Sequence, residues 1–110
     1  MSESNTKYVP RDPSHYRLSM HAAQRRKNRG ITFEQIANTI ESGIVQEAKG
    51  GHPTVEFVHV PMGSDEAVGV VANAADGTVK TCYWAYECTH PKIVELRKER
   101  GLINSSGVTS

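Results

Sequence analysis

The fold of this chain is decided by the stretch Thr32-Phe-Glu-Gln-Ile-Ala-Asn-Thr-Ile-Glu-Ser-Gly43. Thr32 and Gln35 form a capping box, which begins a helix, and Gly43 is a stop signal. Between them, apolar residues recur at the spacing of one helix face: Phe33, Ile36, Ala37 and Ile40. We therefore expect a helix here, with Phe33, Ile36 and Ile40 buried against a sheet.

Two further helices are predicted by similar signals. Ser19 can cap a helix over roughly Met20–Arg29, and Gly30 occupies the position of a left-handed C-terminal cap. Later in the chain, Pro91 suits a first helical turn, and apolar residues follow it before Gly101. The sequence therefore predicts one helix before Thr32 and a closing helix of about ten residues from Pro91.

Beyond Gly43 the apolar pattern changes from helical to extended. Four segments rich in Val and Thr follow: Ile44–Ala48, Thr54–Val60, Ala67–Ala72 and Thr78–Ala85. Short turns separate them, and Asp76-Gly77 is a strong turn signal. Such short connections predict an antiparallel meander that begins after residue 40. We predict an α+β fold, in which two N-terminal helices and a C-terminal helix pack on one face of a four-stranded antiparallel sheet.

The chain of 110 residues is long enough for one compact domain. We assign residues 1–13, which are polar and contain two prolines, to a flexible arm, residues 14–101 to the domain, and residues 102–110 to a flexible tail. No window approaches the ~18 apolar residues of a membrane span, and the start lacks the apolar core of a signal peptide. We expect a cytoplasmic protein with no membrane partner, whose two cysteines are thiols.

Charge is distributed unevenly along the chain. The formal net charge of +1 argues against a protein that holds nucleic acid through a global basic field. Residues 1–33, however, carry seven Lys or Arg against two acids, a net +5, whereas the remaining 77 residues carry a net −4. No acid occurs between Pro13 and Phe33. The positive charge is therefore concentrated on the first predicted helix and its flanks.

Two motifs carry a family resemblance. The first is His21-Ala22-x-x-Arg25-x-x-x-Arg29-Gly30-Ile31-Thr32, and the second is the strand Val79-Lys-Thr81-Cys-Tyr83-Trp84. With the predicted helix ending at Gly43 between them, the chain resembles small bacterial and archaeal domains related to the RelE/ParE and BrnT toxins, a domain family of unknown function. The resemblance covers roughly Tyr16 to Tyr86, about two thirds of the chain. It implies two N-terminal helices on a four-stranded antiparallel sheet.

The resemblance implies less about function than about fold. Members of the wider superfamily include ribonucleases, gyrase poisons and proteins with no known activity, so the fold alone selects none of them. A toxin of this kind normally travels with an antitoxin, often an acidic or amphipathic helix that lies over the basic groove. The resemblance therefore implies a protein partner, and it matches Tyr83 to the aromatic position of the family.

His21, Arg25 and Arg29 lie at i, i+4 and i+8, so one stripe of the helix, the His21–Arg29 stripe, carries an imidazole and two fixed cations. RNA cleavage without metal needs a base for the 2′-hydroxyl, cations for the phosphorane and an acid for the 5′-oxygen, and His and Arg can supply these. A second interpretation stays open. In it, the basic residues are a solvated face and His21 bonds to the adjoining loop.

The last predicted strand has two mixed faces. Alternation places Lys80, Cys82 and Trp84 on one face and Val79, Tyr83 and Ala85 on the other. Val79 and Ala85 indicate that the Tyr83 face is buried, and Lys80 indicates that the Trp84 face is wet. Trp84 can stack on an unpaired base, or it is a core or partner contact. Tyr83 can transfer a proton only if its hydroxyl reaches the His21–Arg29 stripe; otherwise it is a buried tyrosine with a satisfied hydroxyl.

The remaining candidates for chemistry are histidines and cysteines. His59 ends an apolar row on the second predicted strand and is typical of a core-edge histidine, whereas His52 lies in a turn that can flank a site. Cys82, Cys88 and His90 lack the two-residue knuckle of zinc signatures and have no obvious fourth ligand. We therefore expect no metal site, and no motif for a nucleotide cofactor is present.

Two functional hypotheses follow. The first is a toxin-type RNA-binding protein that cleaves RNA without metal, with His21, Arg25 and Arg29 as catalytic residues and Tyr83 as a helper. Its further RNA contacts are assigned to Arg26, Lys27, Lys80 and Trp84. The second is a non-catalytic module that binds nucleic acid or an acidic protein through the same basic helix. RNA and a cognate antitoxin are the expected partners, and catalysis is left open between the two hypotheses.

Overall fold

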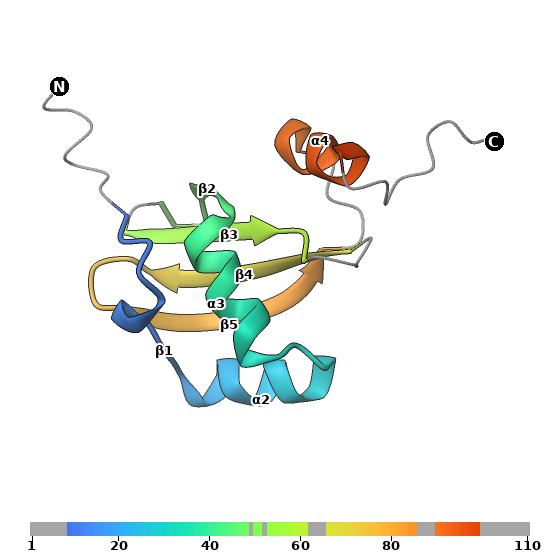
Figure 1. Ribbon diagram of the computed structural model, residues 1–110. Helices are drawn as coiled ribbons and strands as arrows, with labels where there is room; N and C mark the ends of the chain where they lie inside the picture. The colour runs from blue at the N-terminus through green and yellow to red at the C-terminus, as the bar shows by residue number, and fades with distance from the viewer. Residues whose placement is uncertain (1–8, 49, 52, 62–65, 86–89, 100–110) are drawn as a thin grey trace, which may run out of the picture.

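The computed structural model describes residues 9–48, 50–51, 53–61, 66–85 and 90–99. In this part of the chain a five-stranded sheet of order β1-β5-β4-β3-β2 is flanked by three α-helices (Figure 1). The element bounds are a 3-10 turn η1 Pro13–His15, β1 Arg17–Leu18, α2 Met20–Arg29, α3 Phe33–Ser42, β2 Ile44–Glu47, β3 Thr54–His59, β4 Ala67–Asn73, β5 Thr78–Ala85 and α4 Pro91–Glu99. None of the described helices is long and apolar enough to cross a membrane.

The helices α2 and α3 are confirmed, together with the caps that the sequence predicts. The Ser19 side chain accepts a hydrogen bond from the backbone N–H of Ala22, and Gly30 adopts the left-handed conformation with φ 69°. Both bonds of the capping box are present: Thr32 Oγ1 accepts from the Gln35 N–H, and Gln35 Oε1 accepts from the Thr32 N–H. Local sequence therefore fixes where α2 and α3 begin.

The four predicted strands form the expected antiparallel meander, but the sheet has a fifth strand. β1 pairs in parallel with β5, with Arg17 opposite Thr78 and Leu18 opposite Val79. The prediction of a four-stranded, wholly antiparallel sheet that begins after residue 40 is therefore wrong on this point. A strand of two residues is too short to show a period, and its partner strand is distant in the sequence, so no local pattern could reveal it.

The helices cover both faces of the sheet, not one as the sequence predicts. α2 and α3 pack on the face that buries Phe57 and Val70. Ile93 of α4 packs instead with Val58 and Ala67. Since successive side chains of a strand point to opposite faces, Phe57 and Val58 lie on different sides. The second face has apolar residues of its own at one end of the sheet, and α4 covers them.

The described part of the predicted arm, residues 9–13, lies against the C-terminal end of α3. Arg11 Nε donates a hydrogen bond to the Ile40 carbonyl oxygen at 2.7 Å, and the other end of its guanidinium donates to the Gly43 carbonyl oxygen. A cation is favoured at this position because the helix carbonyls point toward it. Residues 1–8 of the arm and the predicted tail, 102–110, lie outside the described residues.

The apolar face of α3 is buried except at its first residue. Ile36 and Ile40 are only 5% and 2% exposed, which confirms their prediction. Phe33 is 63% exposed, so its predicted burial is wrong. Side chains of a helix point back toward its N-terminus, so the ring of Phe33 in the first turn lies at the end of the apolar face, against the guanidinium of Arg26.

Replacing Ile36 by alanine tests the packing of α3 on the sheet. We expect Ile36→Ala to lower the free energy of unfolding by ~2–4 kcal/mol, because a buried side chain is removed and a cavity remains. Urea denaturation measures the change. Asn38→Ala, at an exposed position of the same helix, is the control, with an expected change within about 0.5 kcal/mol. Equal losses in the two variants would contradict the described packing.

Candidate nucleic-acid interface

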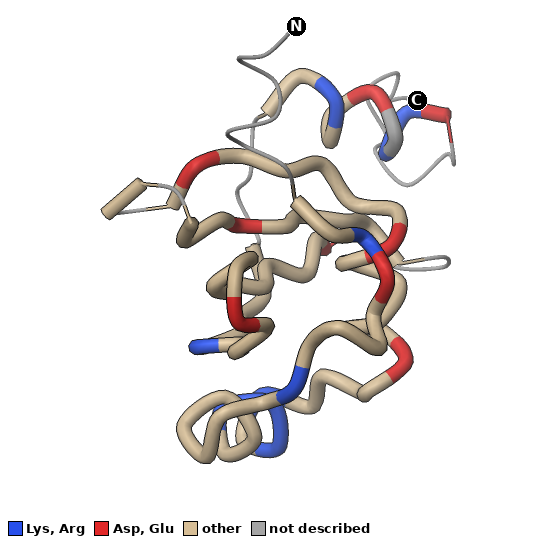
Figure 2. The backbone as a smooth tube through the Cα atoms, turned by 90° about the vertical axis from the view of Figure 1, so that its left-hand side faces the viewer, with Lys and Arg blue, Asp and Glu red and all other residues tan. Residues whose placement is uncertain are grey.

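Helix α2 carries the densest positive charge of the described chain. Its ten residues include Arg25, Arg26, Lys27 and Arg29 and no acid. Figure 2 shows these cations grouped at one end of the molecule, while acidic residues are spread over the other elements. Three of the four lie in the last turn, where the helix dipole also favours cations. The positive charge of α2 therefore stabilises the helix itself. It also attracts anions to this end of the molecule.

Two of these cations hold α2 in place. Arg26 is half-buried and donates from Nη1 to the Ile31 carbonyl oxygen at 3.0 Å. Arg29 donates from Nη1 to the Cys82 carbonyl oxygen of β5 at 2.7 Å. A guanidinium has five N–H donors, so each arginine keeps further donors after these bonds. Arg26 and Arg29 therefore both have a structural role. Arg29 is exposed, so it can still contact a ligand.

His21 and Arg25 meet as their spacing predicts. Arg25 Nε donates a hydrogen bond to His21 Nε2 at 3.2 Å, and both residues are exposed. A ring nitrogen that accepts a hydrogen bond carries no proton, so Nε2 is the basic nitrogen of the imidazole in this arrangement. Lys27 is exposed on the same helix. With Arg29, which is also exposed, α2 thus offers an accessible imidazole and three accessible cations.

The faces of β5 differ in part from the predicted ones: Val79 is buried and Lys80 is exposed, as predicted, but Cys82 is also buried. Val79 lies opposite Ala72 and Thr81 lies opposite Val71, so Lys80 is an extra residue at a bulge. A bulge breaks the alternation of side chains, which brings Val79 to the same side as Cys82 in the core under α2 and α3. The predicted wet face is therefore wrong at Cys82 and Trp84, and Tyr83 is only half-buried on the other face.

Trp84 fastens α2 to the sheet. It packs against the core under α2 and α3, and its Nε1 donates to the Arg29 carbonyl oxygen at 2.7 Å. Together with the bond from Arg29 to the Cys82 carbonyl oxygen, this makes a reciprocal contact between the end of α2 and β5. Of the two interpretations of Trp84, this geometry favours the core contact. Lys80 is exposed at the bulge.

Tyr83 lies on the opposite face of the sheet from α2. Its ring covers Gly69 of β4, where an added Cβ would come within 2.4 Å of Tyr83 Cζ. Gly69 lies between two residues of the core under α2 and α3, Val68 and Val70, and so faces the other way. The structure therefore does not bring Tyr83 to His21, and the condition for a shared proton-transfer site is not met.

Cys82 is a core residue. It is fully buried, and its Sγ lies 3.9 Å from the Ala22 carbonyl oxygen. Burial raises the pKa of the thiol, and the nearby cations of Arg29 and Arg26 offset this only in part. The described residues contain no group of three or more His, Cys, Asp or Glu that could hold a metal ion. Cys88 and His52 lie outside the described residues.

His59 and His90 have structural positions. His59 is 8% exposed at the end of β3, on the same side as Phe57, as predicted for a core-edge histidine. His90 accepts from the backbone N–H of Lys92 at 3.1 Å and thereby caps the start of α4.

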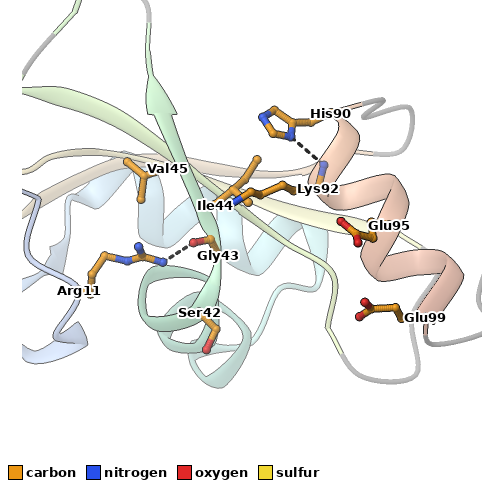
Figure 3. Close-up of a pocket in the computed structure, with 9 residues that line it drawn as sticks. All are labelled: Arg11, Ser42, Gly43, Ile44, Val45, His90, Lys92, Glu95 and Glu99. Carbon is orange, nitrogen blue, oxygen red and sulfur yellow. Dashed lines mark hydrogen bonds between the residues drawn. The ribbon is translucent and has the colours of Figure 1, made fainter.

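A cavity of about 640 Å³ lies away from α2. It lies between the α3–β2 junction and α4 (Figure 3). Its charges are mixed, with Arg11 and Lys92 against Glu95 and Glu99. The guanidinium of Arg11 is already bound to the Gly43 carbonyl oxygen. None of the residues that we assign to RNA contact is among those lining it.

Comparison with known proteins finds no family model, no curated protein and no solved structure that matches this chain. The resemblance to the RelE/ParE and BrnT-related domains stays a prediction from the motifs. The exposed side chains of α2 are therefore the basis for the proposed function.

Proposed function

We propose that this protein is a toxin-type RNA-binding domain that contacts RNA through the exposed side of α2. The observation that carries the proposal is the accessible group of Arg25, Lys27 and His21 on a helix without acidic residues. Phosphate contacts by Lys and Arg supply most of the affinity of sequence-independent nucleic-acid binding. A local cluster can do this although the whole chain has a net charge of only +1.

Each basic residue of α2 has its own part in this proposal. Arg25 and Lys27 contact phosphates directly, since both are exposed. Arg29 holds α2 on β5 and presents its remaining donors. Arg26 adds positive potential from a half-buried position. A cognate antitoxin of acidic character would compete with RNA for the same cations, so partner and RNA would exclude one another.

Metal-independent cleavage is a second candidate, favoured by the contact between His21 and Arg25. Nε2 of His21 is the acceptor of that hydrogen bond, so it is unprotonated. If Arg25 turns to an RNA phosphate, Nε2 is released and can take the proton of a 2′-hydroxyl. The guanidinium would then stabilise the charge of the phosphorane, and the protonated His21 would return its proton to the 5′-oxygen as the P–O5′ bond breaks. Tyr83 has no part in this candidate because it lies across the sheet.

Removing one exposed cation tests the RNA-binding proposal. We expect Arg25→Ala to weaken binding of single-stranded RNA of every sequence and to reduce the slope of log affinity against log salt by about 0.7, the share of one phosphate contact. Fluorescence anisotropy over a salt series measures both. Arg29→Ala is less suitable, because it also removes the bond to β5.

Lys98→Ala is the matched control for Arg25→Ala. It removes one exposed cation from α4, which lies on the other face of the sheet. Its affinity for RNA should equal that of the wild type. If Arg25→Ala and Lys98→Ala lose affinity equally, or if neither loses any, the proposed interface on α2 is refuted.

A further inference from the structure

Phe33 is a surface aromatic residue held in a defined position. It is 63% exposed, although it belongs to the apolar pattern of α3. The guanidinium carbon of Arg26 lies 3.9 Å from the centroid of its ring, the distance of a close cation–π contact. Arg26 is itself fixed by its bond to the Ile31 carbonyl oxygen. One side of the ring is therefore covered by a cation of α2.

The rest of the ring borders a shallow groove between β1 and α3. The groove has a volume of about 130 Å³, and Phe33 lines it while Arg26 does not. Its other walls are mainly apolar: Tyr16, Leu18, Ile36, Ala37 and Val79. Arg17, an exposed cation, also lines the groove. β1 leads directly into α2 (Figure 1), so the groove adjoins the basic helix.

We propose that Phe33 is a stacking platform for an unpaired nucleobase of single-stranded RNA, seated at this groove. The inference rests on the proposed RNA binding and adds the class of RNA that is bound. Every base has a flat π-face that stacks on an aromatic ring without sequence preference. The occupant should also carry negative charge beside its flat face, since Arg17 lines the groove and Arg26 of α2 lies against the ring of Phe33. A nucleotide has both properties.

Base pairing in a duplex conceals the faces of a base, so the Phe33 platform would distinguish single-stranded RNA from double-stranded RNA. In a duplex every base is stacked between its neighbours, and only phosphates and groove edges are accessible. The cations of α2 would contact the phosphates of either form. Phe33 would therefore add affinity for single strands alone, while Arg25 and Lys27 set the affinity that the two forms share.

Two variants and two probes test the platform. The probes are a single-stranded RNA oligonucleotide and an abasic oligonucleotide with the same number of phosphates. We expect Phe33→Leu to weaken binding of the RNA roughly 5- to 100-fold, the loss of one stacked base, and to leave binding of the abasic probe unchanged. Phe33→Tyr keeps the ring and should bind both probes as the wild type does. Since residue 33 is exposed, urea denaturation should give nearly the same midpoint for all three proteins.

The outcomes separate this inference from the proposal on which it rests. If the wild type binds both probes equally and Phe33→Leu changes nothing, the protein binds RNA by phosphate contacts alone and the platform is refuted. The groove would then suit a different occupant, such as an apolar peptide. If the wild type binds neither probe, the proposed function fails, and the platform fails with it. Upfield shifts of the Phe33 ring protons on addition of adenosine monophosphate would support stacking directly, and unchanged shifts would oppose it.

Discussion

Gly77→Ala is expected to lower the free energy of unfolding by about 2–5 kcal/mol and to detach β1 from the sheet. Gly77 has a φ of 79°, which costs a residue with a side chain ~1–2 kcal/mol. An added Cβ would also lie 2.1 Å from the carbonyl oxygen of His15. That oxygen belongs to the backbone and cannot rotate away, so overpacking adds ~1–3 kcal/mol or the N-terminal segment moves.

Two measurements follow the consequences of Gly77→Ala. Urea denaturation gives the loss of stability. Hydrogen exchange reports on β1 and the residue that follows it, since the amides of Arg17 and Ser19 donate to the carbonyl oxygens of Gly77 and Val79. We expect both amides to lose protection, because relief of the contact with His15 requires the N-terminal segment to move.

Gly30→Ala is the control that separates the cost of the positive φ from the cost of the close contact with His15. Gly30 also has a positive φ, of 69°, but an added Cβ there would meet no atom within 4 Å. This variant should lose only the ~1–2 kcal/mol of the backbone strain and keep the protection of β1. If both variants lose the same stability, the close packing of residues 13–15 on the β4–β5 turn is refuted.

His21→Gln is expected to lower the rate of RNA cleavage ~10²-fold or more while most RNA binding is retained, if the cleavage candidate holds. Glutamine preserves a polar side chain but cannot exchange a proton near neutrality, whereas the imidazole can. Arg25 stays cationic at any working pH, so it continues to attract phosphate. The pH–rate profile should also change shape, since the titrating base has been removed.

The cleavage assay uses purified protein, a chelator, a mixed-sequence single-stranded RNA and its 2′-deoxy counterpart. Attack by the neighbouring hydroxyl is impossible in the latter, so only the RNA should be cut, with a cyclic phosphate as product. His90→Gln, at the start of α4, is the matched control and should cleave as the wild type does. Cleavage that survives His21→Gln would exclude His21 as the base. No cleavage of any RNA, with or without ribosomes, would leave RNA binding as the whole function.

The elements of the fold that could be predicted are those whose ends are marked by residues close in the sequence, such as helix caps and tight turns. Ser19, Gly30 and the pair of Thr32 and Gln35 determine the ends of α2 and α3 within a few residues of sequence. The turn at Asp76-Gly77 likewise fixes the β4–β5 hairpin. β1 carries no such signal, because its pairing with β5 joins distant segments of chain. The bulge at Lys80 is also invisible to a pattern that assumes strict alternation.

In the candidate site, too, only the contacts that have a local sequence signal could be predicted. The contact between His21 and Arg25 follows from i, i+4 spacing on one helix, so the sequence could predict it. The bonds of Arg29 with Cys82 and Trp84 depend on how α2 docks on β5, and no local pattern encodes that. One feature of the sequence could have predicted the exposure of Phe33, namely its place in the first turn of the helix, directly after the Thr32 cap. That position lies at the margin of the apolar face, where the side chain is covered only in part.

Titration of ¹⁵N-labelled protein with single-stranded RNA, followed through the shifts of backbone amide signals, tests most directly whether α2 is the RNA-binding surface. We expect the largest shifts in α2, smaller ones at the start of α3 and none in α4. Raising the salt concentration should reverse them, because phosphate contacts are screened. An α2 whose signals do not move, or shifts confined to α4 and the cavity beside it, would contradict the claim that α2 is the surface that binds RNA.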